Sequence, residues 1–232
     1  MDEQEQLKQK AAHYAVEFIK SGMAVGLGTG STAAYAVQQI AKRLQAGDLK
    51  NIIGIPTSIR TEKLARKLEL PLCGLNAQPI IDLTIDGADE VDADLNLIKG
   101  GGGALLREKV VAQASYRNII VIDESKLSSR LGTRWALPVE VIPFAVKPEE
   151  NFLRSLGASV TLRLDRQGQP YKTDQHNYIL DANFGEMADP HRLAALLNER
   201  AGIVEHGLFL SLAGDVIVAA QDEIRHLKRG EK

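Results

Sequence analysis

Ionisable side chains beside a run of glycines form the strongest chemical signal in this sequence. Four consecutive glycines at 100–103 follow Lys99, and Glu108 comes nine positions after that lysine. Glycine runs cost backbone entropy on folding, so this run indicates close approach of the backbone to a ligand. A lysine there can stabilise negative charge on oxygen, and a glutamate at the start of a helix can act as a base. The alternative for Glu108 is an exposed helix residue between Arg107 and Lys109.

A second glycine-rich segment, GLGTGST at 26–32, lies between a predicted strand and a predicted helix. Backbone N–H groups and the helix dipole favour an anion at such a place, and phosphate is the natural guest. The glycine spacing differs from the dinucleotide-binding pattern, and no lysine completes a triphosphate-binding loop. The hydroxyls of Thr29, Ser31 and Thr32 suit a single phosphate or sugar hydroxyls. Equally, such a turn could serve packing alone, with a serine or threonine as helix cap.

Two carboxylates end an alternating apolar segment in DGADE at 86–90. Asp86 and Asp89 can converge on one ligand and accept hydrogen bonds from its hydroxyl groups. Part of a calcium-binding loop is also present, but Ala93 occupies the position where that loop needs a bidentate glutamate, so we do not predict an EF-hand. A divalent ion between the two aspartates and a solvated acidic turn stay open as alternatives.

A fourth cluster, DESK at 123–126, ends another predicted strand. Lys126 could close over a phosphate or be a solvated loop cation. The five histidines lie outside all four segments and form no metal-binding pair. The single cysteine, Cys73, excludes an internal disulfide and a cysteine-built zinc site. We therefore predict no metal site built from histidine or cysteine, and we expect a reducing compartment.

The composition is that of an ordinary globular protein, with 44% hydrophobic residues among 232. Its 28 basic and 30 acidic residues give a net charge of −2, which argues against a partner bound through a broad basic field, whether nucleic acid or anionic membrane. The N-terminus is charged where a secretory signal would be apolar, and the longest apolar region, 207–220, is interrupted by Ser211 and Asp215. We expect a cytoplasmic protein that binds a small molecule and neither nucleic acid nor membrane.

Helical and strand patterns alternate through the first half of the chain. Apolar spacing predicts helices at 7–19, 33–44, 64–68 and 104–114, and strands at 23–27, 52–55, 81–85 and 118–123. This alternation predicts an α/β fold with a doubly wound, mostly parallel, Rossmann-like sheet. Ligands of such sheets bind at the carboxyl ends of the strands, where GLGTGST, DGADE and DESK lie.

The order of elements changes after Leu137 to βαββαβ, which is typical of a ferredoxin-like unit. The predicted strands are 139–142, 159–164, 178–182 and 203–209, and the predicted helices are 148–156 and one with Asp189 as N-cap and Pro190 in its first position. A last strand at 215–220 is predicted to return to the first sheet. We therefore predict an α/β catalytic domain, 1–132 plus 210–232, with a smaller inserted α+β domain, 133–209.

Together these segments resemble the type A ribose-5-phosphate isomerases. GLGTGST, DGADE, KGGGGALLREK at 99–109, DESK and LPVEVIP at 137–143 occur in the order and spacing of that family, and the resemblance covers essentially the whole chain. It implies an aldose-ketose isomerase that interconverts D-ribose 5-phosphate and D-ribulose 5-phosphate in the non-oxidative pentose phosphate pathway. It also implies homodimers or homotetramers, and neither metal nor organic cofactor.

The resemblance also implies roles for individual residues. Glu108 would be the proton-transferring base, within a catalytic set that includes Asp86, Asp89 and Lys99. The substrate-binding residues would be Thr29, Gly30, Ser31, Thr32, Asp86, Gly87, Ala88, Asp89, Lys99, Gly100, Gly101, Gly102 and Lys126. Lys8 is a further candidate for the phosphate site, whereas the stretch 166–177 is expected to bear little on chemistry.

The expected reaction moves a proton between C1 and C2 of the open-chain sugar through an enediolate. In this hypothesis Glu108 moves the proton, Lys99 and glycine-run amides hold the enediolate oxygen, and Asp86 assists ring opening. Coenzyme A transferases and sugar-phosphate deaminases share the expected fold, but KGGGG with Glu108 points away from both. A sugar-phosphate-sensing transcription regulator needs a DNA-binding module, and roughly twenty residues before the first strand are too few for a helix-turn-helix.

Overall fold

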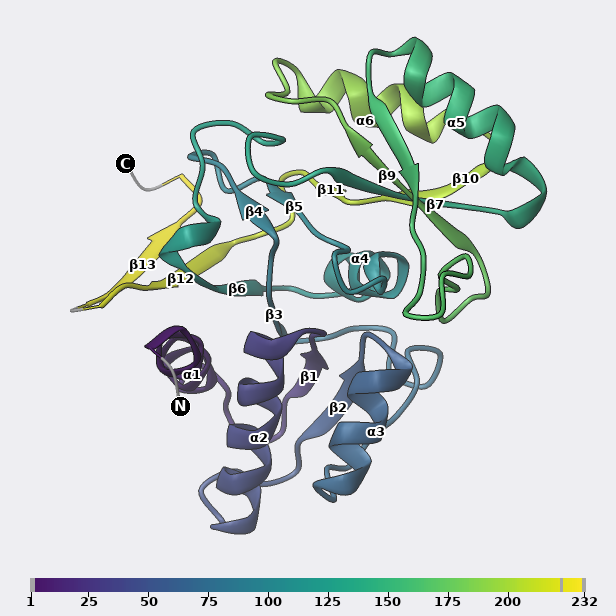
Figure 1. Ribbon diagram of the computed structural model, residues 1–232. Coiled ribbons are helices and arrows are strands. Elements are labelled where there is room, and N and C mark those ends of the chain that lie inside the picture. The colour runs from purple at the N-terminus through teal and green to yellow at the C-terminus, as the bar shows by residue number, and fades with distance from the viewer. Residues whose placement is uncertain (1–2, 222, 231–232) are drawn as a thin grey trace. The chain divides into compact units, whose positions relative to one another are not determined.

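A computed structural model covers the chain, and residues 3–221 and 223–230 are described here (Figure 1). Contacts divide the chain into two compact units. The first comprises Met1–Ala88, Arg107–Lys126 and Ser211–Lys232, and the second comprises Asp89–Leu106 and Leu127–Leu210. The predicted boundaries of a catalytic and a small domain stay a prediction, since a compact unit need not fold alone.

The first unit is built on a six-stranded sheet with the order β13-β12-β6-β3-β1-β2. The five strands from β2 to β12 run parallel in the order 2-1-3-4-5 of a doubly wound sheet, and only β13 is antiparallel. The predicted sheet is therefore confirmed, including the return of the last apolar run as β12, whereas β13 was not predicted. The strands are β1 (Ala24–Leu27), β2 (Ile53–Pro56), β3 (Leu83–Asp86), β6 (Asn118–Asp123), β12 (Asp215–Ala219) and β13 (Ile224–Lys228).

Helices cover both faces of this sheet (Figure 1). Alternate strand side chains such as Val25 and Leu83 point to the face that packs against the first three helices. The opposite face receives Val111 of the fourth helix, which packs with Ala24, Ile55 and Ile81. The helices are α1 (Glu3–Val16), α2 (Ser31–Gln45), α3 (Ile59–Lys67) and α4 (Leu105–Gln113).

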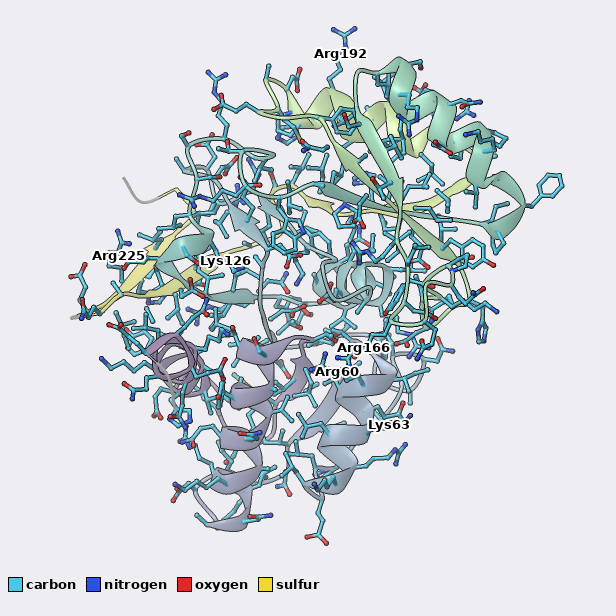
Figure 2. All side chains as sticks on the ribbon, in the orientation of Figure 1. Arg60, Lys63, Lys126, Arg166, Arg192 and Arg225 are labelled. Atoms are coloured by element: carbon cyan, nitrogen blue, oxygen red, sulfur yellow. The ribbon has the colours of Figure 1, made fainter. Side chains whose placement is uncertain are left out.

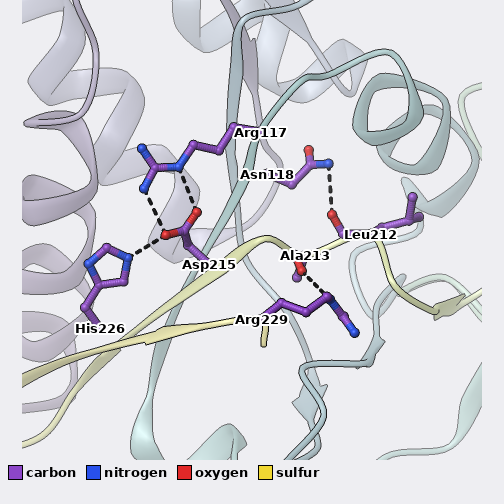
Figure 3. Close-up of polar contacts among 7 residues, drawn as sticks. All are labelled: Arg117, Asn118, Leu212, Ala213, Asp215, His226 and Arg229. Atoms are coloured by element: carbon purple, nitrogen blue, oxygen red, sulfur yellow. Dashed lines mark hydrogen bonds and ion pairs between the residues drawn. The ribbon is translucent and has the colours of Figure 1, made fainter. Parts of the chain in front are cut away.

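A polar cluster joins β13 to its neighbour β12 (Figure 3). The guanidinium of Arg117 donates two hydrogen bonds to the carboxylate of Asp215, over 2.7 and 2.8 Å, and Nε2 of His226 lies 2.6 Å from Asp215 Oδ1. The Arg117 guanidinium also lies 4.6 Å from the centre of the Phe18 ring. Burial by itself raises the pKa of Asp215, but the hydrogen bonds from Arg117 and His226 outweigh it and hold that pKa below its ordinary value.

The second unit contains a four-stranded antiparallel sheet with the order β10-β7-β9-β8, which is the 4-1-3-2 order of a ferredoxin-like unit and confirms that prediction. Two helices cover one face of the sheet (Figure 1). Asp189 caps the second of them by accepting a hydrogen bond from the Arg192 amide, as predicted. The elements are β7 (Leu137–Val141), η2 (Pro143–Ala145), α5 (Val146–Ser155), β8 (Ser159–Leu162), β9 (Tyr178–Asn183), α6 (Pro190–Asn198) and β10 (Ile203–His206).

The predicted single strand at 203–209 is wrong, because the chain changes sheets at Gly207. Its N–H donates to the Pro138 carbonyl over 2.7 Å, and its carbonyl accepts from the Lys99 N–H over 2.9 Å. A Cβ on Gly207 would lie 2.3 Å from the Lys99 carbonyl oxygen, so only glycine fits between these two partners. The residues beyond it enter a second, three-stranded sheet made of β11 (Leu208–Phe209), β5 (Leu97–Ile98) and β4 (Glu90–Val91).

The ends of two helices differ from the predicted ones. Helix α1 ends at Val16 instead of Ile19, because the residues after it form turns. Helix α3 begins at Ile59, earlier than predicted, because the Ser58 hydroxyl accepts a hydrogen bond from the Thr61 amide and caps it. Among the described residues, no helix has both the length and the apolar character needed to span a membrane.

Candidate active site

The carboxyl ends of β1 and β3 meet at the point where the strand order of the first sheet reverses, the usual ligand site of such folds. Asp86, the last residue of β3, is buried, and its Oδ1 accepts hydrogen bonds from the amides of Thr29 (3.0 Å) and Gly87 (2.8 Å). A Cβ on Gly28 would lie 2.5 Å from the Ile85 carbonyl oxygen. The two predicted binding segments are thus locked together by a carboxylate and a glycine.

A buried cluster of hydroxyl groups supports the loop after β1. Thr29 Oγ1 lies 2.8 Å from Thr57 Oγ1, 2.7 Å from Ser58 Oγ and 3.0 Å from Thr61 Oγ1. The Thr61 hydroxyl in turn donates to the Gly28 carbonyl. The sequence analysis missed Thr57, Ser58 and Thr61. Their spacing is a helix-capping signal, because a serine or threonine just before a helix caps its first amides. Thr29 therefore has a structural role, and its predicted contact with substrate stays a prediction.

The amino end of α2 is open toward a ligand. Gly30 occupies the N-cap with φ of 117°, so no side chain caps the first amides of this 15-residue helix, and Ser31 and Thr32 lie in its first turn. Uncapped amides and the helix dipole favour an anion. Lys8 lies beside this helix, because its Nζ contacts Glu5 at 2.7 Å and Glu5 also accepts from the hydroxyl of Tyr35 in α2. Both hydrogen bonds hold the pKa of Glu5 below its ordinary value.

Helix α4 carries Glu108, which is only 5% exposed, on the side that packs against the sheet. Val111 of the same helix face lies against β1, since a Cβ on Gly26 would be 2.9 Å from its Cγ1. One turn further from the amino end, Ser115 hydrogen-bonds to the Thr84 hydroxyl of β3 over 2.7 Å. Glu108 is one turn in the other direction, so helix periodicity directs it toward the carboxyl ends of β1 and β3.

The segment after β6 supplies Lys126 at the same edge of the sheet, because β6 pairs with β3. The buried carboxylate of Asp123 accepts hydrogen bonds from the amide and hydroxyl of Ser125 and so shapes the short helix η1 (Glu124–Lys126). Figure 2 shows Lys126 on this short helix. The first unit thus brings together 29–32, 86–88, Glu108 and Lys126.

The second unit contains the remaining predicted residues. Lys99 directly follows β5, is 3% exposed, and holds its Nζ 5.5 Å from the centre of the Phe209 ring. Asp89 accepts a hydrogen bond from the Gly101 amide at its Oδ2 over 2.7 Å. A Cβ on Gly101 would lie 2.7 Å from the other carboxylate oxygen of Asp89. The glycine run therefore folds back on the aspartate that the sequence analysis placed in the same site.

Two side chains from the connection between β8 and β9 also hold the glycine run, and the sequence analysis missed both. Arg163 Nη1 donates to the carbonyl oxygens of Gly100 (2.8 Å) and Gly101 (3.2 Å). The Tyr171 hydroxyl donates to the Gly102 carbonyl over 3.3 Å. Tyr171 lies in the stretch 166–177 and contacts the run directly, whereas the expectation that this stretch bears little on chemistry stays a prediction.

Glu90, which ends the DGADE motif, is fully buried and has a structural function. Its carboxylate accepts hydrogen bonds from the Ser128 hydroxyl and from the amides of Gly132, Arg134 and Trp135, at 2.7 to 3.2 Å. Such a carboxylate organises a loop that has little secondary structure of its own. Among the described residues, no group of three His, Cys, Asp or Glu could hold a metal ion.

The groups that each unit presents, taken separately, suit the chemistry of a phosphorylated polyol. The first unit offers open helix amides for an anion, a buried carboxylate on a helix and a lysine at a strand end. The second unit offers a buried lysine and a backbone run whose amides are directed by neighbouring side chains. Helix amides can bind phosphate, a carboxylate can move a proton, and a lysine with amides can stabilise an oxyanion.

Comparison with known proteins identifies the family of this chain. The family model "Ribose 5-phosphate isomerase A (phosphoriboisomerase A)" matches residues 53–223. A relative from Desulfatibacillum aliphaticivorans, named ribose-5-phosphate isomerase A, is 59% identical over 98% of this chain and 99% of its own length.

Solved structures agree with this match. A D-ribose-5-phosphate isomerase in complex with phospho-erythronic acid has a TM-score of 0.96 at 38% identity, over 99% of this chain and 100% of its own. The ribose 5-phosphate isomerase of Plasmodium falciparum has a TM-score of 0.94 at 39% identity, over 98% and 100% of the two chains. The chain therefore belongs to the ribose 5-phosphate isomerase A family.

Proposed function

We propose that this protein interconverts D-ribose 5-phosphate and D-ribulose 5-phosphate, as the non-oxidative pentose phosphate pathway requires. The observation that carries the proposal is the match of nearly the whole chain to relatives named for this reaction. The buried Glu108 and the open amino end of α2 add a base and an anion site, which the reaction needs.

The proposed chemistry begins with the open-chain sugar. The Glu108 carboxylate removes the proton from C2 of the aldose, and the electron pair of the broken C–H bond forms the C1–C2 double bond of an enediolate. The protonated Glu108 then returns the proton to C1, while a proton moves from the C2 oxygen to the C1 oxygen, which yields the ketose. The atoms balance without an oxidant or a reductant, and neither metal nor cofactor takes part.

Other residues bind and polarise the substrate in this proposal. The ammonium group of Lys99 and the N–H of Gly102 in the glycine run stabilise the enediolate oxygen, since preorganised donors act most strongly where charge develops. Asp89 and Asp86 accept hydrogen bonds from sugar hydroxyls, and Asp86 assists opening of the furanose ring. The substrate phosphate lies at the amino end of α2, with Lys126 and Lys8 as its cations and Gly87 and Ala88 lining the site.

The decisive experiment uses chelator-treated protein with ribose 5-phosphate and follows ribulose 5-phosphate formation. We expect rapid conversion, and a Glu108→Gln variant should lower kcat by about 10²–10⁴-fold. In D₂O the native protein should also exchange the carbon-bound proton of the sugar, and the variant should not. Glu62→Gln, on helix α3, is the matched control and should keep native turnover.

Two results would contradict the proposal. Near-native turnover by the Glu108→Gln variant would remove Glu108 as the base. Failure of the native protein to convert ribose 5-phosphate would instead overturn the reaction, and coenzyme A esters and amino-sugar phosphates would be the next substrates to test.

We further propose that the protein acts in the cytoplasm as a homodimer or homotetramer that binds neither membranes nor nucleic acid. The free, half-buried Cys73 is consistent with a reducing compartment. Light scattering on a size-exclusion column would measure the mass of the assembly, and a mass of about 25 kDa would contradict the oligomer.

A further inference from the structure

We propose that Arg163 is a positioning residue that sets the orientation of the glycine run at 100–102 for catalysis. This inference rests on the proposed function, because it assigns the run's amides to the reacting sugar. Arg163 follows strand β8, more than sixty residues after the run. It acts through the backbone of the run and touches no reacting atom itself.

The side chain of Arg163 is held in place by Asp181. Its Nε donates to Asp181 Oδ2 over 2.9 Å, and its Nη2 forms a second hydrogen bond with the other oxygen of the same carboxylate. Asp181 lies on strand β9, which pairs with β8, so the two-pronged pair ties the residue that directly follows β8 to the neighbouring strand. The side chain of Arg163 is only 15% exposed. The remaining nitrogen, Nη1, is thereby held in one place, where it meets the carbonyls of Gly100 and Gly101.

A hydrogen bond that fixes a carbonyl oxygen also fixes the direction of the next residue's N–H, because both belong to one planar peptide group. The peptide bonds of the described residues are trans, so the N–H of each residue points away from the carbonyl of the residue before it. The anchored Gly100 carbonyl therefore fixes the Gly101 N–H, which donates to Asp89. The anchored Gly101 carbonyl fixes the Gly102 N–H in the same way.

Of the two amides that follow an anchored carbonyl, the Gly102 N–H is the one that remains for a ligand. Gly102 is exposed, and within residues 3–221 and 223–230 its N–H donates to no protein group. The Gly103 N–H is different, because it donates to the Gly100 carbonyl over 2.9 Å. Arg163 therefore pre-orients one unused amide, and a glycine run without this anchor would have to lose its conformational freedom during each turnover.

The arrangement indicates a geometric role more than an electrostatic one. Asp181 neutralises Arg163, so the pair carries no net charge toward the sugar. A lysine keeps the charge but cannot hold a carboxylate with two prongs and a carbonyl at once. Arg163→Lys is therefore the informative variant, and Asp181→Asn tests the same anchor from its other side.

Arg154 provides a matched control in the same unit. It also bridges a carboxylate and a backbone carbonyl, because its Nε donates to Glu150 (3.1 Å) and its Nη2 donates to the Val160 carbonyl (2.8 Å). Neither group belongs to the glycine run. Arg154→Lys therefore measures how much thermal stability is lost with such a bridge when the glycine run is not affected.

The first measurement is steady-state kinetics with ribose 5-phosphate, together with thermal unfolding of each variant. We expect Arg163→Lys and Asp181→Asn to lower kcat by at least tenfold with KM changed less than threefold, while Arg154→Lys stays within twofold of the native kcat at a similar loss of thermal stability. Affinity for phospho-erythronic acid, whose carboxylate resembles the two enediolate oxygens, should fall in parallel with kcat. Affinity for inorganic phosphate should not change.

The second measurement, amide hydrogen exchange of the ligand-free protein, does not depend on the reaction. Exchange at Gly101 and Gly103 should be at least tenfold faster in Arg163→Lys and unchanged in Arg154→Lys. Native exchange rates there, or a kcat within twofold of native in Arg163→Lys, would overturn the positioning role. If the native protein fails to convert ribose 5-phosphate, the proposed function falls, and the catalytic part of this inference falls with it, whatever the exchange rates are.

Discussion

Two glycine-rich loops of this chain are held in position by contacts from different parts of the sequence. The loop after β1 and the glycine run after β5 each give one amide to an aspartate, Asp86 in the first case and Asp89 in the second. The first loop is otherwise held by hydroxyls at the carboxyl end of the adjacent strand β2. The second is held by Arg163 and Tyr171, which come from the ferredoxin-like part of the chain. One loop is built into its own sheet, whereas the other depends on residues far along the sequence.

The largest expected difference concerns alanine at Gly28 and at Gly101. A Cβ at Gly28 would meet the backbone oxygen of Ile85 at 2.5 Å, whereas a Cβ at Gly101 would meet only the Asp89 carboxylate, which can rotate away. Gly28→Ala should therefore cost about 3 kcal/mol of unfolding free energy. Gly101→Ala should cost less than about 1 kcal/mol but lower turnover.

Urea unfolding and kinetics would test this contrast. The control is Gly74→Ala, because a Cβ there would meet nothing within 4 Å and its φ is not positive. Equal losses of stability at Gly28 and Gly101 would show that the two loops are not anchored differently.

The two units can also be compared through the pH dependence of stability, because each contains a buried carboxylate. The first is Asp215 in the doubly wound unit. Its pKa is held below the ordinary 3.8, so its contribution to stability is present above that pH and is lost as the pH falls through the folded-state pKa. Asp215→Asn should destabilise the protein by about 2 kcal/mol at pH 7, because Arg117 loses a charged partner. The cost should shrink below pH 3.8 in unfolding curves; a cost independent of pH would contradict the assignment.

Glu140 in the ferredoxin-like unit should behave in the opposite sense. Burial raises its pKa above the ordinary 4.5, against hydrogen bonds from Asn177 and Thr173. The folded protein then binds the proton more tightly than the unfolded chain, so stability falls as the pH rises above 4.5. Glu140→Gln should remove this slope, so that the variant gains stability relative to the native protein as the pH rises above 4.5. Parallel stability curves for the two proteins would exclude this assignment.

The smallest expected effect is at Tyr171. Its hydroxyl lies 3.3 Å from the Gly102 carbonyl, a long hydrogen bond, so Tyr171→Phe should cost about 0.5 kcal/mol and lower kcat by about twofold. Tyr116→Phe is the control, because Tyr116 is 77% exposed. A tenfold loss of kcat at Tyr171 would instead place this tyrosine beside Arg163 as a principal anchor.

The six-stranded sheet and the ferredoxin-like order could be predicted from the sequence, because their strands and helices have strong apolar periods and sharp caps such as Asp189. Strand β13 was missed because Arg225, His226 and Lys228 interrupt its apolar pattern. The sheet change at Gly207 was missed because an apolar run reads the same whether it continues in one sheet or crosses to another.

The predicted site residues were found from local signals, since glycines and carboxylates cluster within short segments. Arg163 and Asp181 gave no such signal. They lie on one face of neighbouring strands because Thr161 is in register with Asp181, and the long connection between β8 and β9 leaves this register open from sequence alone. A pair of opposite charges on two predicted strands was the one available indication.

The outermost strands of the six-stranded sheet have a consequence for solubility. β13 is short and carries Arg225 and Lys228, and Figure 2 shows Arg225 at this border of the sheet. At the opposite border, the Gly54 N–H of β2 donates to the Pro71 carbonyl, so a neighbouring segment occupies part of that edge. Charged or occupied edges disfavour pairing with strands from other molecules. Copies of this chain should therefore not associate by extending the six-stranded sheet, which protects a sheet rich in valine and isoleucine from aggregation.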